Sequence, residues 1–272
     1  MYFITVSEMV GSKGEKIAKK VAEALKYPFY GEEELFHAAE GMGFLPDVKK
    51  VDERGPAFFE RFFTERPKIY LDRLQSVIYE VARKGDAVFF GRGSQLLLHS
   101  FGCAFHVLVT GSLEKRIQRV TDEKYVSREV AEKIVERSDH DKRSFFRFAF
   151  NEDWLNPQLY DLLLNTDKLS VESAVQMILN AAKSDEIRAC GLESVKSLGK
   201  LSLQRRVEAA FLERGFVSQN LFVTVEDMDA VRVYGVVHSD EDKKEIEDIL
   251  KKMKDVKTVK NDLAVLRTSG GV

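Results

Sequence analysis

The chain has 272 residues, of which 44% are apolar and 32% charged, and its 42 Lys and Arg residues balance 44 Asp and Glu residues to a net charge of -2. This length and apolar content predict one large or two medium domains with real cores, which excludes general disorder. The balanced charge argues against a strongly basic nucleic-acid binder, so nucleic acid is not an expected partner. The apolar runs are far shorter than the roughly 20 residues of a membrane-spanning helix. The first residues also lack a signal peptide's features, so we expect a cytoplasmic protein without a transmembrane segment.

The two cysteines, Cys103 and Cys190, lie far apart and have no Cys or His neighbours at the spacing of metal ligands. A disulfide framework or a zinc site is therefore not expected. We predict two free thiols and no protein metal site.

Short apolar runs alternate with amphipathic segments over the first two-thirds of the chain. Apolar residues at three- and four-residue spacing predict helices over residues 15–25, 69–83, 95–99, 113–120, 127–150 and 171–182. Continuous apolar or β-branched runs predict strands over residues 2–6, 87–90, 105–109 and 160–165. This alternation predicts an α/β domain with a parallel sheet flanked by helices.

Residues 31–67 interrupt this alternation with prolines and glycine turn signals, and we interpret them as an irregular insertion. Their aromatic cluster, Phe58 to Phe63, has two interpretations. It forms the insertion's own core, or it lines a pocket for a nucleotide base, since bases stack on aromatic rings.

A polar stretch over residues 186–200 is interpreted as a linker between a first domain, residues 1–185, and a second domain, residues 201–268. The second domain is predicted to be small and α+β, with helices over 203–213 and 241–253 and strands over 221–225, 231–237 and up to 266. At about 70 residues it is near the lower size limit for an independent core. Packing against a partner or the first domain, and self-association, therefore stay open.

The N-terminus places a strand, a glycine-bearing turn and a helix in succession, an order that favours anion binding because backbone N–H groups and the helix start converge. The phosphate-binding pattern is G-x-x-x-x-G-K-[ST]. When this pattern is aligned on Lys13, Ser7 and Ser12 stand at the positions of its two glycines. Two interpretations stay open on this window alone, a phosphate-binding loop or a plain strand-to-helix turn.

Four short segments of the chain resemble sequence motifs of one family, and they follow one another in the same order as in that family. Residues 4–18, ITVSEMVGSKGEKIA, are similar to I-T-I-S-R-x-x-G-S-G-G-x-x-I-A, and residues 24–30, ALKYPFY, to L-G-x-P-F-Y. Residues 87–93, AVFFGRG, are similar to V-I-x-G-R-G, and residues 153–166, DWLNPQLYDLLLNT, contain D-W-x-D-P-like and Y-D-L-x-x-N-T elements. Residues 1–182 thus resemble the cytidylate kinase-like family of P-loop nucleoside monophosphate kinases. The resemblance implies a P-loop NTPase fold, a nucleotide substrate, and ATP and Mg²⁺ as cofactors.

The same resemblance implies ATP-dependent phosphoryl transfer to a nucleoside monophosphate, CMP or dCMP, and assigns residues to it. The nucleotide-binding residues would be Gly11, Ser12, Lys13, Gly14, Glu15 and Arg92. The catalytic residues would be Lys13, Asp139, Arg143 and Arg147. The last three lie at i, i+4 spacing on one helix that resembles the family's lid, for which a solvated salt-bridge ladder is the alternative.

Three positions depart from the family. Glu8 replaces an arginine, Glu15 stands at the place of a hydroxyl residue, and Gly93 replaces an aspartate. A carboxylate near a triphosphate repels it unless Mg²⁺ intervenes. The alternative function is therefore a nucleotide-binding, catalytically weak or inactive kinase-like regulator. A pure interaction scaffold is a third interpretation and requires Lys13 to be incidental.

Two segments near the C-terminus carry a second resemblance. Residues 231–237, VRVYGVV, and 256–265, VKTVKNDLAV, are similar to V-x-L-x-G-x-V and G-V-x-x-V-x-N-x-L-x-V. Residues 201–267 thus resemble the BON domain, which in exported proteins is associated with phospholipid or membrane surfaces. Here a small ligand, a protein partner or a membrane surface, as well as a second copy of the chain, stay open as partners.

Overall fold

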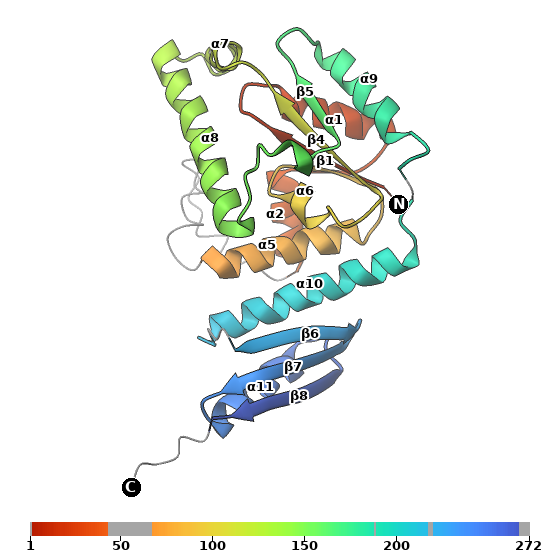
Figure 1. Ribbon diagram of the computed structural model, residues 1–272, viewed down its shortest axis with the longest axis vertical. Coiled ribbons are helices and arrows are strands. Elements are labelled where there is room, and N and C mark those ends of the chain that lie inside the picture. Colours follow the sequence, from red (N-terminus) through yellow and green to blue (C-terminus); the bar gives the residue numbers. More distant parts are fainter. Residues whose placement is uncertain (1, 43–66, 188, 217–219, 267–272) are drawn as a thin grey trace. The chain divides into compact units, whose positions relative to one another are not determined.

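The computed structural model describes residues 2–42, 67–187, 189–216 and 220–266, and they fall into two compact units (Figure 1). Of the described residues, the first unit comprises those up to 41 and those in 84–192, and the second comprises residue 42, residues 67–83 and those from 193 onward. Within this described part, no helix has both the length and the apolar composition needed to cross a membrane.

The first unit is built on a five-stranded, wholly parallel sheet, which confirms the predicted α/β architecture. In the order β2-β3-β1-β4-β5, the strands are Phe29–Tyr30, Ala87–Phe90, Phe3–Glu8, Ala104–Thr110 and Leu162–Asn165. The central strand β1 pairs on both sides, with Phe3 opposite both Ala87 and Ala104. Its residues are almost all buried, as expected for a strand covered on two faces.

Helices surround this sheet. They are α1 Gly14–Leu25, α2 Glu32–Gly41, α6 Ser94–Leu97, α7 Leu113–Lys124, α8 Arg128–Phe150 and α9 Val171–Ala182, with a short 3-10 helix at Pro157–Leu159. Ile17 and Val21 of α1 and Ile178 of α9 are fully buried in one core cluster with Val6 and Val107 of the sheet. The predicted apolar stripes of both helices therefore cover one face of the sheet.

The prediction of an irregular segment from residue 31 onward is wrong for residues 32–41, which form α2. Three glutamates occupy its first turn, where negative charge stabilises a helix. The carboxylate of Glu34 also accepts the N–H of Gly31 at 3.0 Å, which satisfies a donor that the helix cannot. The aromatic cluster Phe58 to Phe63 lies outside the described residues.

The second unit combines helices and a small mixed sheet, as predicted. Its helices are α5 Pro67–Ala82, α10 Leu192–Glu213 and α11 Asp240–Lys252, and its strands are β6 Leu221–Asp227, β7 Ala230–Val237 and β8 Thr258–Val265. The central strand β7 is antiparallel to β6 and parallel to β8. Phe211 of α10, Val233 of β7 and Ile246 of α11 are buried together in one core cluster.

The division of the chain differs from the expected boundaries in two places. Residues 192–200, expected to be linker, form the first part of α10. Helix α5 groups with the second unit although it precedes β3 in the sequence. Ser202 of α10 donates its hydroxyl to the main-chain oxygen of Ser76 at 3.1 Å, and both residues are fully buried. The apolar periodicity predicts that α5 exists, but it does not say which helix α5 packs against.

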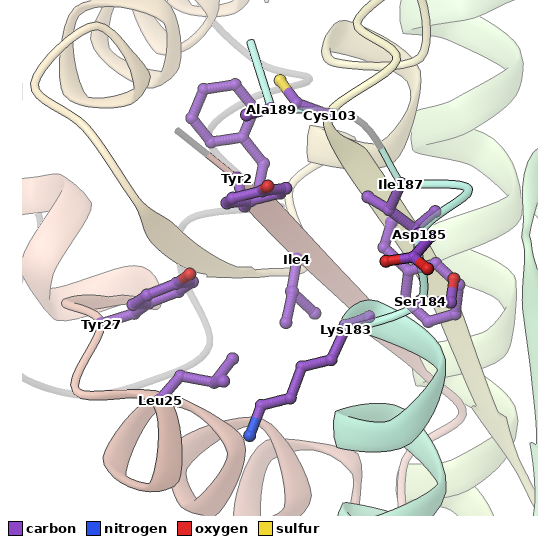
Figure 2. Close-up of a pocket in the computed structure, with 13 residues that line it drawn as sticks. Tyr2, Ile4, Leu25, Tyr27, Cys103, Lys183, Ser184, Asp185, Ile187 and Ala189 are labelled. Atoms are coloured by element: carbon purple, nitrogen blue, oxygen red, sulfur yellow. The ribbon is translucent and has the colours of Figure 1, made fainter.

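A depression of about 480 Å³ lies at the amino ends of β1 and β4 (Figure 2). Tyr2 precedes β1, Tyr27 follows α1, and Lys183 and Asp185 belong to the segment after α9. This depression lies at the opposite end of β1 from the glycine-bearing turn after Glu8.

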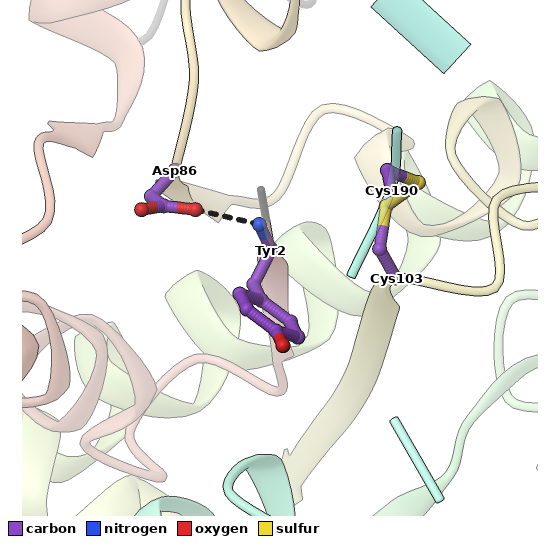
Figure 3. The surroundings of a disulfide bond; sticks show 4 residues. All are labelled: Tyr2, Asp86, Cys103 and Cys190. Carbon is purple, nitrogen blue, oxygen red and sulfur yellow. Dashed lines mark hydrogen bonds between the residues drawn. A yellow bond between two sulfur atoms is a disulfide. The ribbon is translucent and has the colours of Figure 1, made fainter. Parts of the chain in front are cut away.

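A disulfide joins Cys103 and Cys190 beside this depression, so the prediction of two free thiols is wrong (Figure 3). Cys103 is buried just before β4, and Cys190 belongs to the connection between α9 and α10. The fold brings their Cα atoms to 5.2 Å across a separation of 87 residues. Spacing along the sequence cannot reveal that these two ends meet, because only the packed sheet brings them together.

Candidate functional site

The turn after β1 joins this strand to α1, in the order that the sequence predicted. Gly11 has a φ of 83°, and a Cβ atom there would lie 2.6 Å from the main-chain oxygen of Arg116. Ser12 is fully buried, where its N–H donates to Met9 O at 2.9 Å and its hydroxyl donates to Val109 O at 3.0 Å. The turn is therefore tight and rigid, and both donors of Ser12 are satisfied inside the fold.

Two residues that the sequence interpretation did not select hold this turn from the far side. The guanidinium of Arg119 donates to Gly11 O at 3.1 Å and to Thr166 O at 2.6 Å. The hydroxyl of Thr166 lies 3.0 Å from Ser12 O. Thr166 belongs to the Y-D-L-x-x-N-T element, which is the signal that could have identified it.

Lys13 and Gly14 begin α1 at the carboxyl edge of the sheet. Lys13 caps the helix with a φ of 68° and its side chain is exposed. Glu8, the last residue of β1, turns its carboxylate to the same place and accepts the N–H of Glu15 at 3.2 Å. Burial raises the pKa of the Glu8 carboxyl, while Lys142 and the amides of Glu15 and Gly14 act in the opposite direction. The start of α1 thus already contacts an acidic side chain of the chain itself.

Lys142 of α8 reaches this turn. Its ammonium donates to the main-chain oxygen of Glu8 and lies 5.4 Å from the ring centre of Trp154. Burial lowers the pKa of Lys142, while the charges of Glu8 and Asp139 act in the opposite direction. Sequence analysis did not select this lysine, although it stands inside the segment interpreted as a lid.

The three residues predicted on the lid lie in different surroundings. The carboxylate of Asp139 accepts two hydrogen bonds from Arg116, at 2.9 and 2.6 Å, and the Arg116 side chain is only 2% exposed. Arg143 and Arg147 are exposed on α8, and within the described residues neither forms an ion pair. Asp139 therefore orients the buried guanidinium of Arg116 at this edge, whereas Arg143 and Arg147 extend into solvent.

Arg92 lies on the turn after β3, at the same edge. Gly91, Arg92 and Gly93 have successive positive φ angles of 68°, 59° and 75°. The Arg92 guanidinium forms an ion pair with Glu32 of α2 at 2.5 Å, and its side chain is 11% exposed. Burial lowers the pKa of Arg92, while Glu32 acts in the opposite direction. A Cβ atom at Gly93 would lie 2.5 Å from the Phe150 ring, so an aspartate there would require this ring to move.

A depression of about 570 Å³ opens beside the turn and α1, a volume in the range of small-ligand sites. Its charged lining comprises Glu8, Lys13, Glu15, Lys16, Lys19, Lys20, Glu23, Glu123 and Lys124. Lys19 pairs with Glu15 at 2.8 Å and Lys20 with Glu172 at 2.6 Å. Lys13, which caps α1, and Lys16 of its first turn line the depression as well.

Two family comparisons match the chain, each over one part. The cytidylate kinase-like family matches residues 3–168, more than half of the chain, and the BON domain matches residues 201–267. Both matches agree with the resemblances seen in the sequence motifs.

Proteins named cytidylate kinase are similar to most of the chain. That of Methanocaldococcus jannaschii is 25% identical over 181 residues, covering 65% of this chain and 96% of that protein. That of Pyrococcus horikoshii is 27% identical over 202 residues, covering 72% of this chain and 96% of that protein. The crystal structure of an uncharacterized protein from Eubacterium ventriosum has a TM-score of 0.55 at 21% identity, covering 68% of this chain and 99% of that chain. The structural likeness bears on the fold alone.

Proposed function

Because the chain belongs to the cytidylate kinase-like family, we propose that its first unit transfers a phosphoryl group from ATP to a nucleoside monophosphate, CMP or dCMP. The observation that carries this proposal is the gathering of cations from separate segments at one edge of the sheet. Lys142 comes from α8, and the charges of Arg116 and Arg92 both act to lower its pKa. Cations fixed around a transferring phosphoryl group stabilise its charge in the transition state.

The proposed roles follow from these positions. The loop from Gly11 to Gly14 would bind the triphosphate, with Lys13 at the mouth of the depression. Arg143 and Arg147 are exposed on α8 and would reach the transferring phosphoryl group. Asp139 acts through Arg116, whose guanidinium it orients. Arg92 would hold the acceptor nucleotide.

Mg²⁺ suits this set of side chains. Proteins usually hold this ion with one or two carboxylates together with the substrate's phosphates, and the exposed carboxylate of Glu15 lines the depression. When bound, the ion neutralises phosphate charge. Among the described residues, no group of three or more His, Cys, Asp or Glu side chains forms a metal site by itself. The nucleotide would therefore supply the remaining ligands.

A specific contact favours a second candidate, a nucleotide-binding regulator with weak or no catalysis. The Glu8 carboxylate contacts the start of α1, where a phosphate would bind. In this alternative the C-terminal unit relays the nucleotide state to a protein partner, a small ligand or a membrane surface. Phe222 and Tyr234 stack at 5.4 Å and are 48% and 40% exposed on the three-stranded sheet, which makes them candidates for that contact.

A coupled assay for ADP production distinguishes the candidates. It uses Mg²⁺ and ATP with a panel of nucleoside monophosphates, and compares the wild type with Arg143→Ala and with Lys133→Ala, a matched exposed residue of α8. The kinase proposal predicts CMP-dependent turnover that Arg143→Ala lowers by about 10²- to 10³-fold and that Lys133→Ala leaves unchanged. ATP binding without turnover for any acceptor supports the regulator. If neither ATP binding nor turnover is observed, both the kinase and the regulator are contradicted.

A further inference from the structure

The turn after β1 lacks a lysine at the place where the phosphate-binding pattern has one. In G-x-x-x-x-G-K-[ST] a glycine stands immediately before the lysine that begins the helix, and glycine tolerates a positive φ best. Here Lys13 has the positive φ of 68° and caps α1, and Glu8 stands five residues earlier. The backbone therefore aligns Gly14 with the pattern's lysine and Glu15 with its hydroxyl residue.

Glu8 occupies the space that a side chain at Gly14 would need. A Cβ atom at Gly14 would lie 2.5 Å from the Glu8 Cβ atom and 2.8 Å from its Oε2 atom. Because real Cβ atoms do not approach neighbours so closely, the turn itself cannot present a lysine there while Glu8 points to α1. A cation at this place therefore has to come from a residue other than position 14.

Lys142 of α8 brings a cation to the main chain of Glu8. Its ammonium contacts the main-chain oxygen of Glu8, and its charge acts to lower the pKa of the Glu8 carboxyl. The ring of Trp154, at 5.4 Å, holds the lysine from one side. The ammonium thus contacts the main chain of the residue whose carboxylate accepts the N–H of Glu15.

We propose that Lys142 supplies the phosphate-binding cation that the turn lacks at Gly14, and that the Glu8 carboxylate holds the place of the phosphate until a nucleotide displaces it. This inference rests on the proposed nucleotide-binding function and deepens it. A carboxylate and a phosphate compete for the same partners, the helix N–H groups and an ammonium. Affinity for a triphosphate should therefore depend on Lys142 and be reduced by Glu8.

Calorimetric titrations with Mg²⁺-ATP and with adenosine test both parts. Lys142→Met should weaken ATP binding at least tenfold and change adenosine binding less than twofold. Glu8→Gln, which keeps the shape and removes the charge, should tighten ATP binding severalfold without changing adenosine binding. Lys133→Met, on the exposed side of the same helix, should change neither. A merely structural role of Lys142 would weaken both ligands alike.

Lys142→Met leaves the Glu8 carboxylate without its cation. Two further variants therefore separate a loss of folding from a loss of the phosphate-binding charge. Lys142→Arg keeps the charge and should retain most of the ATP affinity. The double variant Glu8→Gln with Lys142→Met removes both charges. It should bind ATP at least tenfold more weakly than Glu8→Gln alone.

A rebuilt turn provides the decisive background. Glu8→Gly, Lys13→Gly and Gly14→Lys together restore the two glycines and the lysine of the pattern and remove the clash at Gly14. In that background, Lys142→Met should change ATP affinity less than twofold. Equal losses for ATP and adenosine, or an unchanged ATP affinity on Lys142→Met in the natural turn, would overturn the inference and leave the proposed function standing. Failure of every variant, including the rebuilt turn, to bind ATP would overturn the proposed function itself.

Discussion

The carboxyl edge of the five-stranded sheet carries ion pairs, and so does the outer face of the three-stranded sheet, which is the face that presents Arg232. The surroundings of the two sets of ion pairs differ. At the edge, the Arg116 side chain is 2% exposed and binds Asp139 with two nitrogens. On the outer face, Arg232 is 41% exposed and pairs with Asp262 and Glu226. Water replaces a lost partner in the second case and not in the first. Sensitivity to substitution, and the capacity to bind a charged ligand, should therefore concentrate at the carboxyl edge.

The largest effect on stability is expected from the covalent link in the first unit. Reducing the Cys103–Cys190 disulfide, which closes a separation of 87 residues, should lower the free energy of unfolding by about 4–5 kcal/mol, because the open chain regains conformational freedom. Urea unfolding with and without reductant measures this loss. A double Cys→Ala variant serves as the control and should not respond to reductant. If reductant leaves the urea midpoint of the wild type unchanged, the stabilising role of the Cys103–Cys190 disulfide is contradicted.

Arg116→Met should cost about 3–5 kcal/mol, because it leaves the Asp139 carboxylate without its buried partner. Urea unfolding followed by circular dichroism measures the change. If the loss is below 1 kcal/mol, the pair behaves like a surface pair and the contrast between the two regions fails.

Asp72 is a buried carboxyl in the second unit and tests whether that unit has sensitive charges of its own. Burial raises the pKa of Asp72 to about 7, with Glu208 acting in the same direction and Arg205 against it. The unfolded chain therefore ionises first, and stability falls as pH rises from about 4 to 7. Asp72→Asn should remove this loss, gaining up to about 4 kcal/mol on the wild type between pH 4 and pH 8. If the stability of the wild type and that of Asp72→Asn change in parallel between pH 4 and pH 8, the raised pKa of Asp72 is refuted.

His106 of β4 shows the opposite pH dependence in the first unit. Burial lowers its pKa to about 4, Asp161 acts against this, and its Nδ1 atom lies 2.7 Å from the Thr5 hydroxyl. The neutral ring is favoured, so its contribution is complete above pH 6.5 and is lost as pH falls toward 4, by about 3 kcal/mol. His106→Gln should flatten this part of the stability curve. The exposed His140→Gln should leave the curve unchanged.

Arg232→Met should have the smallest effect, about 0–1 kcal/mol, because both partners of this arginine are solvated. Measured beside Arg116→Met, it is the same chemical change in the other region. A cost above 2 kcal/mol would mean that the outer face holds a strained or covered network.

Local sequence patterns predicted most elements of the fold, since apolar periodicity depends on residues three or four positions apart. The parallel sheet, α1, α5 and α9 all followed from it. Helix α2 was missed because its stabilising features are the charged first turn and the Glu34 contact with Gly31, rather than an apolar stripe. The grouping of α5 with α10 and the disulfide were missed because both join segments that are far apart in the sequence.

The candidate site was predicted in part for the same reason. The turn from Gly11 to Gly14 lies in one short window, which a motif can describe. Arg119, Thr166 and Lys142 act on that turn from three other segments, so no local pattern connects them with it. The alignment on Lys13 also used letters alone, whereas its positive φ identifies it with the pattern's glycine.

A titration of ¹⁵N-labelled protein with Mg²⁺-ATP, followed by backbone amide signals, tests most directly the central claim that nucleotide phosphates bind at the start of α1. We predict that the signals of Gly11, Gly14 and Glu15 shift with ATP and much less with adenosine, while Gly235 of the second unit keeps its position. Unchanged signals at those three residues, with shifts elsewhere or none, would contradict the claim.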